Sequence, residues 1–175
     1  SVFKICSLDT ISSDLKIFPL RSIWSCACDY DKPIIHQIIE LTCQIASDYV
    51  TQSNSLPFDF LFIFESCFHT FEHDMVYQHT RQLIISHLNS EKYSDHIVGL
   101  CLLRCMVLNL PHEVFHDADF IINEVEKGLK SDDDLMIEIS SIIISSCFAP
   151  ISSNLIDVDS LIPQFVPLLI HPNPD

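Results

Sequence analysis

A chain of 175 residues, 48% of them hydrophobic, is long enough to bury a core as a single domain over 1–175. Its formal net charge of -15 would repel phosphate backbones, so we expect no nucleic-acid partner and favour a protein or peptide partner of basic character. The longest apolar run, 97–110, is interrupted by Arg104 and is too short to span a bilayer, which argues against a membrane protein.

Helical spacing of apolar residues runs through almost the whole sequence, and no window alternates as a half-buried strand does. Only two glycines are present, too few for the tight turns of sheets. We predict an all-α protein with helices at 14–28, 33–49, 57–72, 75–89, 94–109, 112–117, 119–130, 134–148 and 159–170. The predicted connectors are short and polar: 29–33, 51–55, 131–134 and 152–154. In the third of them, 132–134 is a run of aspartates placed to cap the following helix.

Most of the eight cysteines stand inside apolar helix patterns, where reduced cysteine serves as a small core residue. These are Cys43, Cys67, Cys101, Cys105 and Cys147. Residues 1–4 are not followed by the long apolar stretch of a secretory signal. We therefore expect a cytoplasmic or nuclear protein.

One string recurs at the ends of three predicted helices, at nearly equal spacing along the chain. Its copies are 88–91, 129–132 and 169–172, and each begins with a leucine that closes an amphipathic helix. This spacing matches the period of roughly 40 residues that is typical of helical solenoids. We predict repeats near 14–55, 56–90, 91–131 and 132–171. Because 173–175 would start another helix, we expect the chain to be a fragment of a longer solenoid.

The closing string 160–175 resembles the turn between successive armadillo repeats, where a helix ending in two leucines meets an Asn-Pro-Glu-type start. Leu168 and Leu169 supply the leucines, and Asn173, Pro174 and Asp175 supply the start. The resemblance is good over 75–175 and weaker over 14–74, and it does not extend to 1–13. It implies a right-handed α-solenoid of about four repeats that binds a partner peptide or helix on its concave face, with no catalytic activity and no cofactor.

In the importin-α branch of the armadillo family, the groove-lining helix carries a tryptophan and, four positions later, an asparagine that clamp an extended basic peptide. Trp24 takes the tryptophan place in one partial match, and Cys28 stands where asparagine would. Ser141 and Ser145 fall on the corresponding places of the last full repeat. The resemblance thus implies a module similar to a nuclear-transport adaptor that lacks the peptide clamp. A lone tryptophan such as Trp24 is more often a core residue than a groove residue.

Isolated charges in apolar helices give a second indication of the groove. Glu138, Ser141 and Ser145 share one polar stripe of the helix 134–148. Shifting Ser145 back by one repeat reaches Arg104, and a further repeat reaches Glu65. Because ions are rarely buried without a partner, we predict that Glu65, Arg104 and Ser145 line one concave surface. We also predict that Glu65 and Arg104 pair across neighbouring repeats, which in an exposed pair contributes less than about 1 kcal/mol.

The segment 112–116 matches H-E-x-x-H, the helical zinc motif of many metalloproteases. His112 and His116 could bind Zn²⁺ from one helix face, Glu113 could act as base, and Glu138 is a better candidate for the third ligand than Glu126. A zinc-dependent metallohydrolase is therefore the alternative function. We favour the scaffold and assign no metal, because the preceding proline starts a new short helix and no strand is evident to present a substrate.

Overall fold

The protein is represented by a computed structural model that describes residues 11–25, 32–57, 59–60, 62–65, 73–109 and 118–151. Every regular element within these residues is an α-helix, which confirms the all-α prediction for this part of the chain. The helices are α2 (Ser13–Ser25), α3 (Lys32–Ser53), α5 (His73–Leu88), α6 (Tyr93–Asn109), α8 (Ala118–Leu129) and α9 (Asp134–Ile151), and residues 59–60 and 62–65 are also helical. The helices predicted at 112–117 and 159–170 lie outside the described residues.

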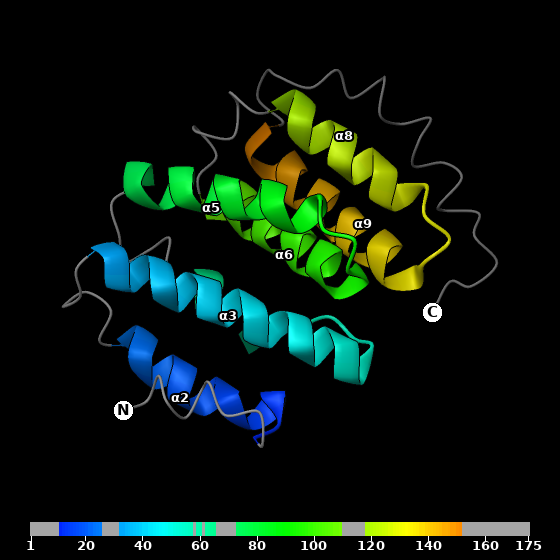
Figure 1. Ribbon diagram of the computed structural model, residues 1–175. Coiled ribbons are helices and arrows are strands. Elements are labelled where there is room, and N and C mark those ends of the chain that lie inside the picture. Colours follow the sequence, from blue (N-terminus) through cyan, green and yellow to red (C-terminus); the bar gives the residue numbers. More distant parts are fainter. Residues whose placement is uncertain are drawn as a thin grey trace.

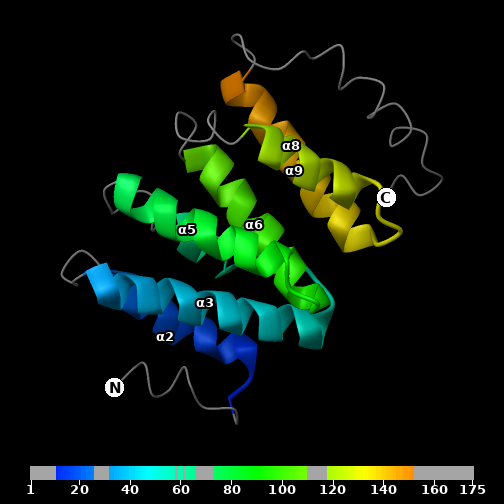
Figure 2. The ribbon, with the colours of Figure 1, turned by 45° about the horizontal axis from the view of Figure 1, so that its top comes forward.

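The helices pack in chain order as three successive pairs, α2 with α3, α5 with α6, and α8 with α9 (Figure 1). The second member of each pair also contacts its counterpart in the next pair, so that α3 packs on α6 and α6 on α9. A view turned by 45° shows the same order, with α5 and α6 between the other two pairs (Figure 2).

Helix α6 lies at the centre of this arrangement and is buried almost all round, because it packs against α3, α5 and α9. Residues 97–103 and 105–107 are all buried, and Arg104 between them is partly buried. This position explains why the longest apolar run of the sequence has no polar face. Across the described part of the chain, no helix has both the length and the apolar character needed to cross a membrane.

Both glycines stand inside helices, at points where two helices of a pair approach closely. A Cβ atom on Gly99 of α6 would lie 3.0 Å from Leu88 Cδ2 of α5. A Cβ atom on Gly128 of α8 would lie 1.9 Å from Ser140 Oγ of α9. Each glycine therefore allows an approach that any side chain would obstruct.

The turns that join α5 to α6 and α8 to α9 have the same hydrogen bonds, displaced by one predicted repeat. In the first turn, Asn89 N donates to Ile85 O and Ser90 N to His87 O; in the second, Lys130 N donates to Glu126 O and Ser131 N to Gly128 O. Residue 92 N donates to Ser90 Oγ, and residue 133 N likewise donates to Ser131 Oγ, both at 3.1 Å. Two of the three recurring strings thus fold alike, and the third lies outside the described residues.

The acidic run before α9 caps that helix, as predicted from the sequence. Asp133 Oδ1 accepts a hydrogen bond from Met136 N at 2.9 Å, so Asp133 is the N-cap residue. The same oxygen accepts a hydrogen bond from Tyr93 OH, 2.7 Å away at the start of α6. Burial and the neighbouring Asp133 raise the pKa of Tyr93, which keeps its hydroxyl protonated as a donor. The two helix starts are therefore tied to each other.

The predicted end of the helix at 49 is wrong, since α3 continues to Ser53. The hydroxyls of the polar run that suggested a connector bond to backbone carbonyls one turn earlier in the same helix: Thr51 Oγ1 to Ser47 O at 2.8 Å, and Ser53 Oγ to Tyr49 O at 2.9 Å. Asn54 then ends the helix in the left-handed region, with a φ of 49°.

Candidate functional site

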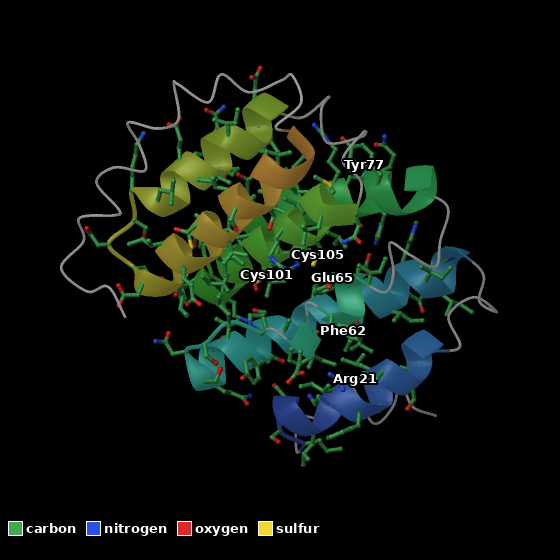
Figure 3. All side chains as sticks on the ribbon, turned by 180° about the vertical axis from the view of Figure 1, so that it is seen from behind. Arg21, Phe62, Glu65, Tyr77, Cys101 and Cys105 are labelled. Atoms are coloured by element: carbon green, nitrogen blue, oxygen red, sulfur yellow. The ribbon has the colours of Figure 1, made fainter. Side chains whose placement is uncertain are left out.

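The predicted ion pair between Glu65 and Arg104 is present, with Arg104 Nη1 2.8 Å from Glu65 Oε1. The two side chains retain only 28% and 22% of their exposure, so the pair is more deeply buried than the exposed pair expected from the sequence. Figure 3, which shows the molecule from behind, displays Glu65 near Cys105 of α6. The pair joins the helical segment 62–65 to α6.

The described cysteines are core residues rather than nucleophiles. Cys43, Cys101 and Cys105 are buried and form no disulfide, as predicted. Burial raises the pKa of Cys101 to about 12, and burial together with Glu65 raises that of Cys105. Burial raises the pKa of Cys43 as well. These thiols therefore stay protonated at neutral pH, which makes them unreactive. Cys67 and the side chain of Cys147 lie outside the described residues.

The serines of the predicted groove bond to their own helix. Ser141 Oγ donates to Ile137 O and Ser145 Oγ donates to Ile142 O, both at 2.8 Å. Ser145 and Glu138 are exposed, and Ser141 is half-buried. That Ser145 shares a concave surface with Glu65 and Arg104 stays a prediction.

The remaining sequence candidates fall outside the described residues. Trp24 belongs to the last turn of α2, but its side chain is not described, and Cys28 follows the described part of that helix. The H-E-x-x-H segment 112–116 is also outside. Among the side chains that are described, no three His, Cys, Asp or Glu residues are grouped to hold a metal ion.

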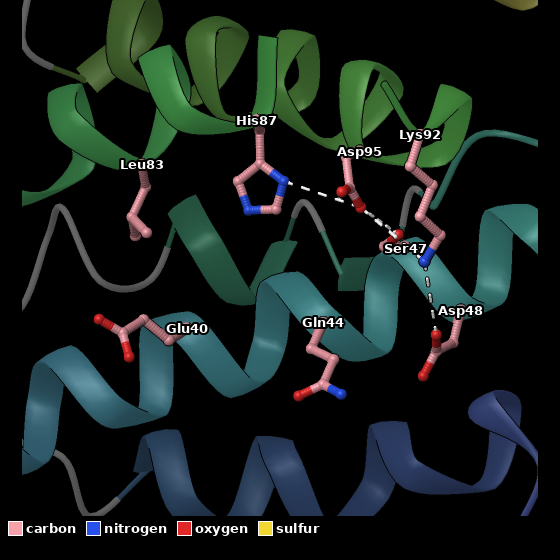
Figure 4. Close-up of a pocket in the computed structure, with 8 residues that line it drawn as sticks. All are labelled: Glu40, Gln44, Ser47, Asp48, Leu83, His87, Lys92 and Asp95. Atoms are coloured by element: carbon pink, nitrogen blue, oxygen red, sulfur yellow. Dashed lines mark hydrogen bonds and ion pairs between the residues drawn. The ribbon is translucent and has the colours of Figure 1, made fainter. Parts of the chain in front are cut away.

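The structure also shows a pocket that sequence reasoning missed, with a volume of about 320 Å³ between α3, α5 and the start of α6 (Figure 4). We call it the acidic pocket, because three carboxylates and one ammonium group line it. Its lining residues are Glu40, Gln44, Ser47, Asp48, Leu83, His87, Lys92 and Asp95.

Asp95 is held in place by a hydroxyl network that ties α3 to α6. Its two carboxylate oxygens accept hydrogen bonds from Ser47 Oγ at 2.5 Å and from Ser90 Oγ at 2.8 Å. Ser47 is also 2.9 Å from Ser94 Oγ, which accepts a further bond from Thr51 Oγ1 at 3.0 Å. Burial raises the pKa of Asp95, but the hydrogen bonds from Ser47 and Ser90, together with the nearby Lys92 and His87, outweigh burial, so that the pKa lies below its usual value. Asp95 is therefore ionised at neutral pH.

The charges at the mouth of the acidic pocket are only loosely paired. Lys92 Nζ lies 3.9 Å from Asp48 Oδ1 and 3.9 Å from Asp95 Oδ1, beyond normal hydrogen-bond distance. His87 Nδ1 lies 4.0 Å from Asp95 Oδ1. Burial lowers the pKa of His87 more than Asp95 raises it, so this ring is mostly neutral near pH 7. Glu40, whose side chain is 57% exposed, adds a third carboxylate, and the pocket is therefore net negative.

The line along which α3 and α5 face each other, which we call the seam, continues from the acidic pocket to a pair of histidines. The rings of His36 on α3 and His79 on α5 stack with centroids 3.7 Å apart and planes 4° from parallel. Glu40 Oε1 lies 3.8 Å from His79 Nε2. The pocket and the histidine pair thus share one carboxylate.

Part of the acidic pocket could have been recognised from the sequence. Glu40, Gln44 and Asp48 recur at every fourth position, which places them on one face of a predicted helix. The other charged residues of the pocket, Lys92 and Asp95, belong to a distant part of the sequence. Only the packing of α3 on α6 brings the two groups together, and no local pattern encodes that packing.

Comparisons with protein-family models, with curated proteins and with solved structures found no match to this chain. The geometry of the described residues is therefore the basis for assigning a function.

Proposed function

We propose that this chain is a non-catalytic interaction scaffold, an α-solenoid of armadillo-like repeats that holds a basic segment of a partner protein in the acidic pocket. The observation that carries the proposal is the pocket itself, an opening of about 320 Å³ whose carboxylates come from both α3 and α6. A lysine or arginine side chain is the group that such a lining attracts most strongly.

The order of helix contacts supports a solenoid. Each described pair of helices packs on the next, through the contacts of α3 with α6 and of α6 with α9. The first pair and the third are thus connected mainly through the second. The two turns with equivalent hydrogen bonds, one predicted repeat apart, support a repeated unit. In a solenoid each unit stabilises its neighbours, and the surface that runs across the units serves to bind partners.

The charge balance supports a basic partner. The whole chain carries a net charge of -15, which steers cationic ligands towards it over long range. Within the acidic pocket, Lys92 is too far from either carboxylate to neutralise it by a direct hydrogen bond. The buried, protonated thiols suit a reducing compartment, and we propose that the scaffold acts in the cytoplasm or the nucleus, with a transport adaptor as the most specific form of this function.

The proposal is tested by titrating the protein into a fluorescent arginine-rich peptide and measuring the anisotropy. We expect the double variant E40Q/D48N to weaken binding about 2- to 30-fold, since each carboxylate–cation contact at an exposed site contributes about 0.2–1 kcal/mol. Raising the ionic strength should weaken binding to the native protein more than to the variant.

Two further variants make the result specific. D119N/D132N removes the same charge from exposed positions outside the pocket and should change the affinity by less than about twofold. E138Q tests the groove predicted from the sequence. Equal losses of affinity in E40Q/D48N and D119N/D132N would show that only net charge matters, and would refute binding in the acidic pocket. A loss of affinity confined to E138Q would show that the peptide binds at α9 instead.

A further inference from the structure

Lys92 brings an ammonium group to the acidic pocket from the turn that precedes α6. Its Nζ lies 3.9 Å from Asp48 Oδ1 of α3 and 3.9 Å from Asp95 Oδ1 of α6, so it contacts carboxylates on both walls of the pocket (Figure 4). Half of its side-chain surface remains exposed. A basic side chain of a partner that entered the pocket would meet these carboxylates at the place that Lys92 already holds.

The start of a helix is an unfavourable position for this cation. Lys92 O accepts the hydrogen bond that closes the first turn of α6, from His96 N at 3.3 Å, so Lys92 is the N-cap residue of that helix. An ammonium group has no acceptor for the free N–H groups of the first turn, and the N-terminal end of a helix repels positive charge. The side chain of Lys92 therefore does not cap α6.

The equivalent position of the next turn carries the residue that a helix start favours. Asp133 O accepts the hydrogen bond that closes the first turn of α9, from Ile137 N at 3.1 Å. Asp133 also caps that helix, because its Oδ1 accepts a hydrogen bond from Met136 N at 2.9 Å. One predicted repeat earlier, Lys92 stands in place of such a carboxylate. The acidic pocket, rather than the helix, accounts for a cation at this position.

We propose that Lys92 is a displaceable internal ligand of the acidic pocket, which pairs with Asp48 and Asp95 in the free protein and moves into solvent when a partner's basic side chain takes its place. This inference rests on the proposed function. Both contacts exceed hydrogen-bond distance, so they cost little to break. Asp95 keeps its hydrogen bonds from Ser47 and Ser90 when Lys92 leaves, and these bonds hold the carboxylate in place for the incoming cation. Lys92 therefore sets the affinity that a basic partner must exceed.

The fluorescent arginine-rich peptide tests this role by anisotropy titration of three variants. We expect K92M to bind about 2- to 30-fold more tightly than the native protein, because two contacts, each corresponding to about a 1.4- to 5-fold change in affinity, no longer have to be broken. K92R keeps the charge and should bind as the native protein does. K127M removes an ammonium group that bonds to Glu124 outside the pocket, and should strengthen binding by less than about twofold. Equal gains in K92M and K127M would refute the proposal.

The displacement itself is followed by NMR of the lysine side chains in the native protein. As the peptide is added, the Cε–Hε signals of Lys92 should move to the position typical of a solvent-exposed lysine, while those of Lys127 stay in place. Unchanged Lys92 signals at saturation would refute the displacement, and the pocket would remain the binding site if E40Q/D48N still weakens binding. If neither the native protein nor K92M bound the peptide, the proposed function would be wrong, and this inference with it.

Discussion

Replacing Gly128 with alanine is expected to push α8 away from α9. The added Cβ atom would lie 1.9 Å from Ser140 Oγ, 3.1 Å from Ser140 Cβ and 3.3 Å from Met136 O. Rotation of the Ser140 hydroxyl relieves only the first of these contacts. The other two involve a Cβ atom and a backbone oxygen, which move only if the helix moves.

The size of the effect follows from two opposing terms. Overpacking of this kind costs about 1–3 kcal/mol, and alanine regains about 1 kcal/mol over glycine inside a helix. We therefore expect G128A to lower the free energy of unfolding by up to about 2 kcal/mol. In a protein of this size, that corresponds to a fall in Tm of up to about 8 °C.

Thermal and urea unfolding of a double-mutant cycle tests this reasoning. Ser140 is fully buried, and its hydroxyl makes no hydrogen bond to any described residue, so S140A alone should be neutral or stabilising by up to about 1 kcal/mol. In G128A/S140A the closest contact is removed, and we expect at least about 0.5 kcal/mol of the loss to be recovered. The control is N123A, at an exposed position of α8, which shows the effect of the helix propensity of alanine on stability without a change in packing. A G128A protein as stable as N123A would refute the close approach of the two helices.

Three further predictions concern the polar groups. Because the pKa of Asp95 is lowered in the folded state, the stabilisation that its carboxylate provides is complete above about pH 4 and is lost as the pH falls through the folded pKa. We expect D95N to lower the free energy of unfolding at pH 7 by about 1–3 kcal/mol. In acid titrations followed by circular dichroism, D95N should lose less stability below about pH 4 than the native protein does. E65Q should destabilise the protein by about 1–3 kcal/mol in urea unfolding, since it leaves the half-buried Arg104 charge without its partner. The double variant E65Q/R104M removes that charge as well and should recover most of the loss. Equal stability of E65Q and the double variant would contradict this. Purified protein should contain much less than one zinc per chain by elemental analysis, and stoichiometric zinc lost in H116A would instead support the metallohydrolase.

Most of the helices could be predicted because their apolar faces repeat with the helical period; α6, which is buried almost all round, is the exception. The end of α3 could not, because residues 51–53 read as a polar connector until their hydroxyls are seen bonding to carbonyls one turn back. The glycines show the same limit. Their scarcity argued correctly against sheets in the described part of the chain. The residues next to Gly99 and Gly128 in the sequence, however, do not indicate the neighbouring helix that each glycine accommodates.

Functional residues could be predicted from the sequence where their polarity differs from that of the helix around them. Arg104 is the one charged residue in a long apolar run, so a partner was expected, and Glu65 supplies it. The acidic pocket has no such signal. Asp95 opens a helix, as many aspartates do, and its role depends on Ser47, which lies on a helix much earlier in the chain.

Side-chain hydrogen bonds between successive pairs join the end of α3 to the start of α6, and the start of α6 to the turn before α9. Ser47 and Thr51 meet Ser94 near the start of α6, and Tyr93 meets Asp133 at the start of α9. If the pairs rotated about this line of bonds, the far ends of the long helices would move most. From Ser47 to His36, α3 measures about 16 Å, so a rotation of about 10° would displace the histidine end by about 3 Å. Small changes at the turns would in this way alter the width of the seam, and with it the shape that a partner meets.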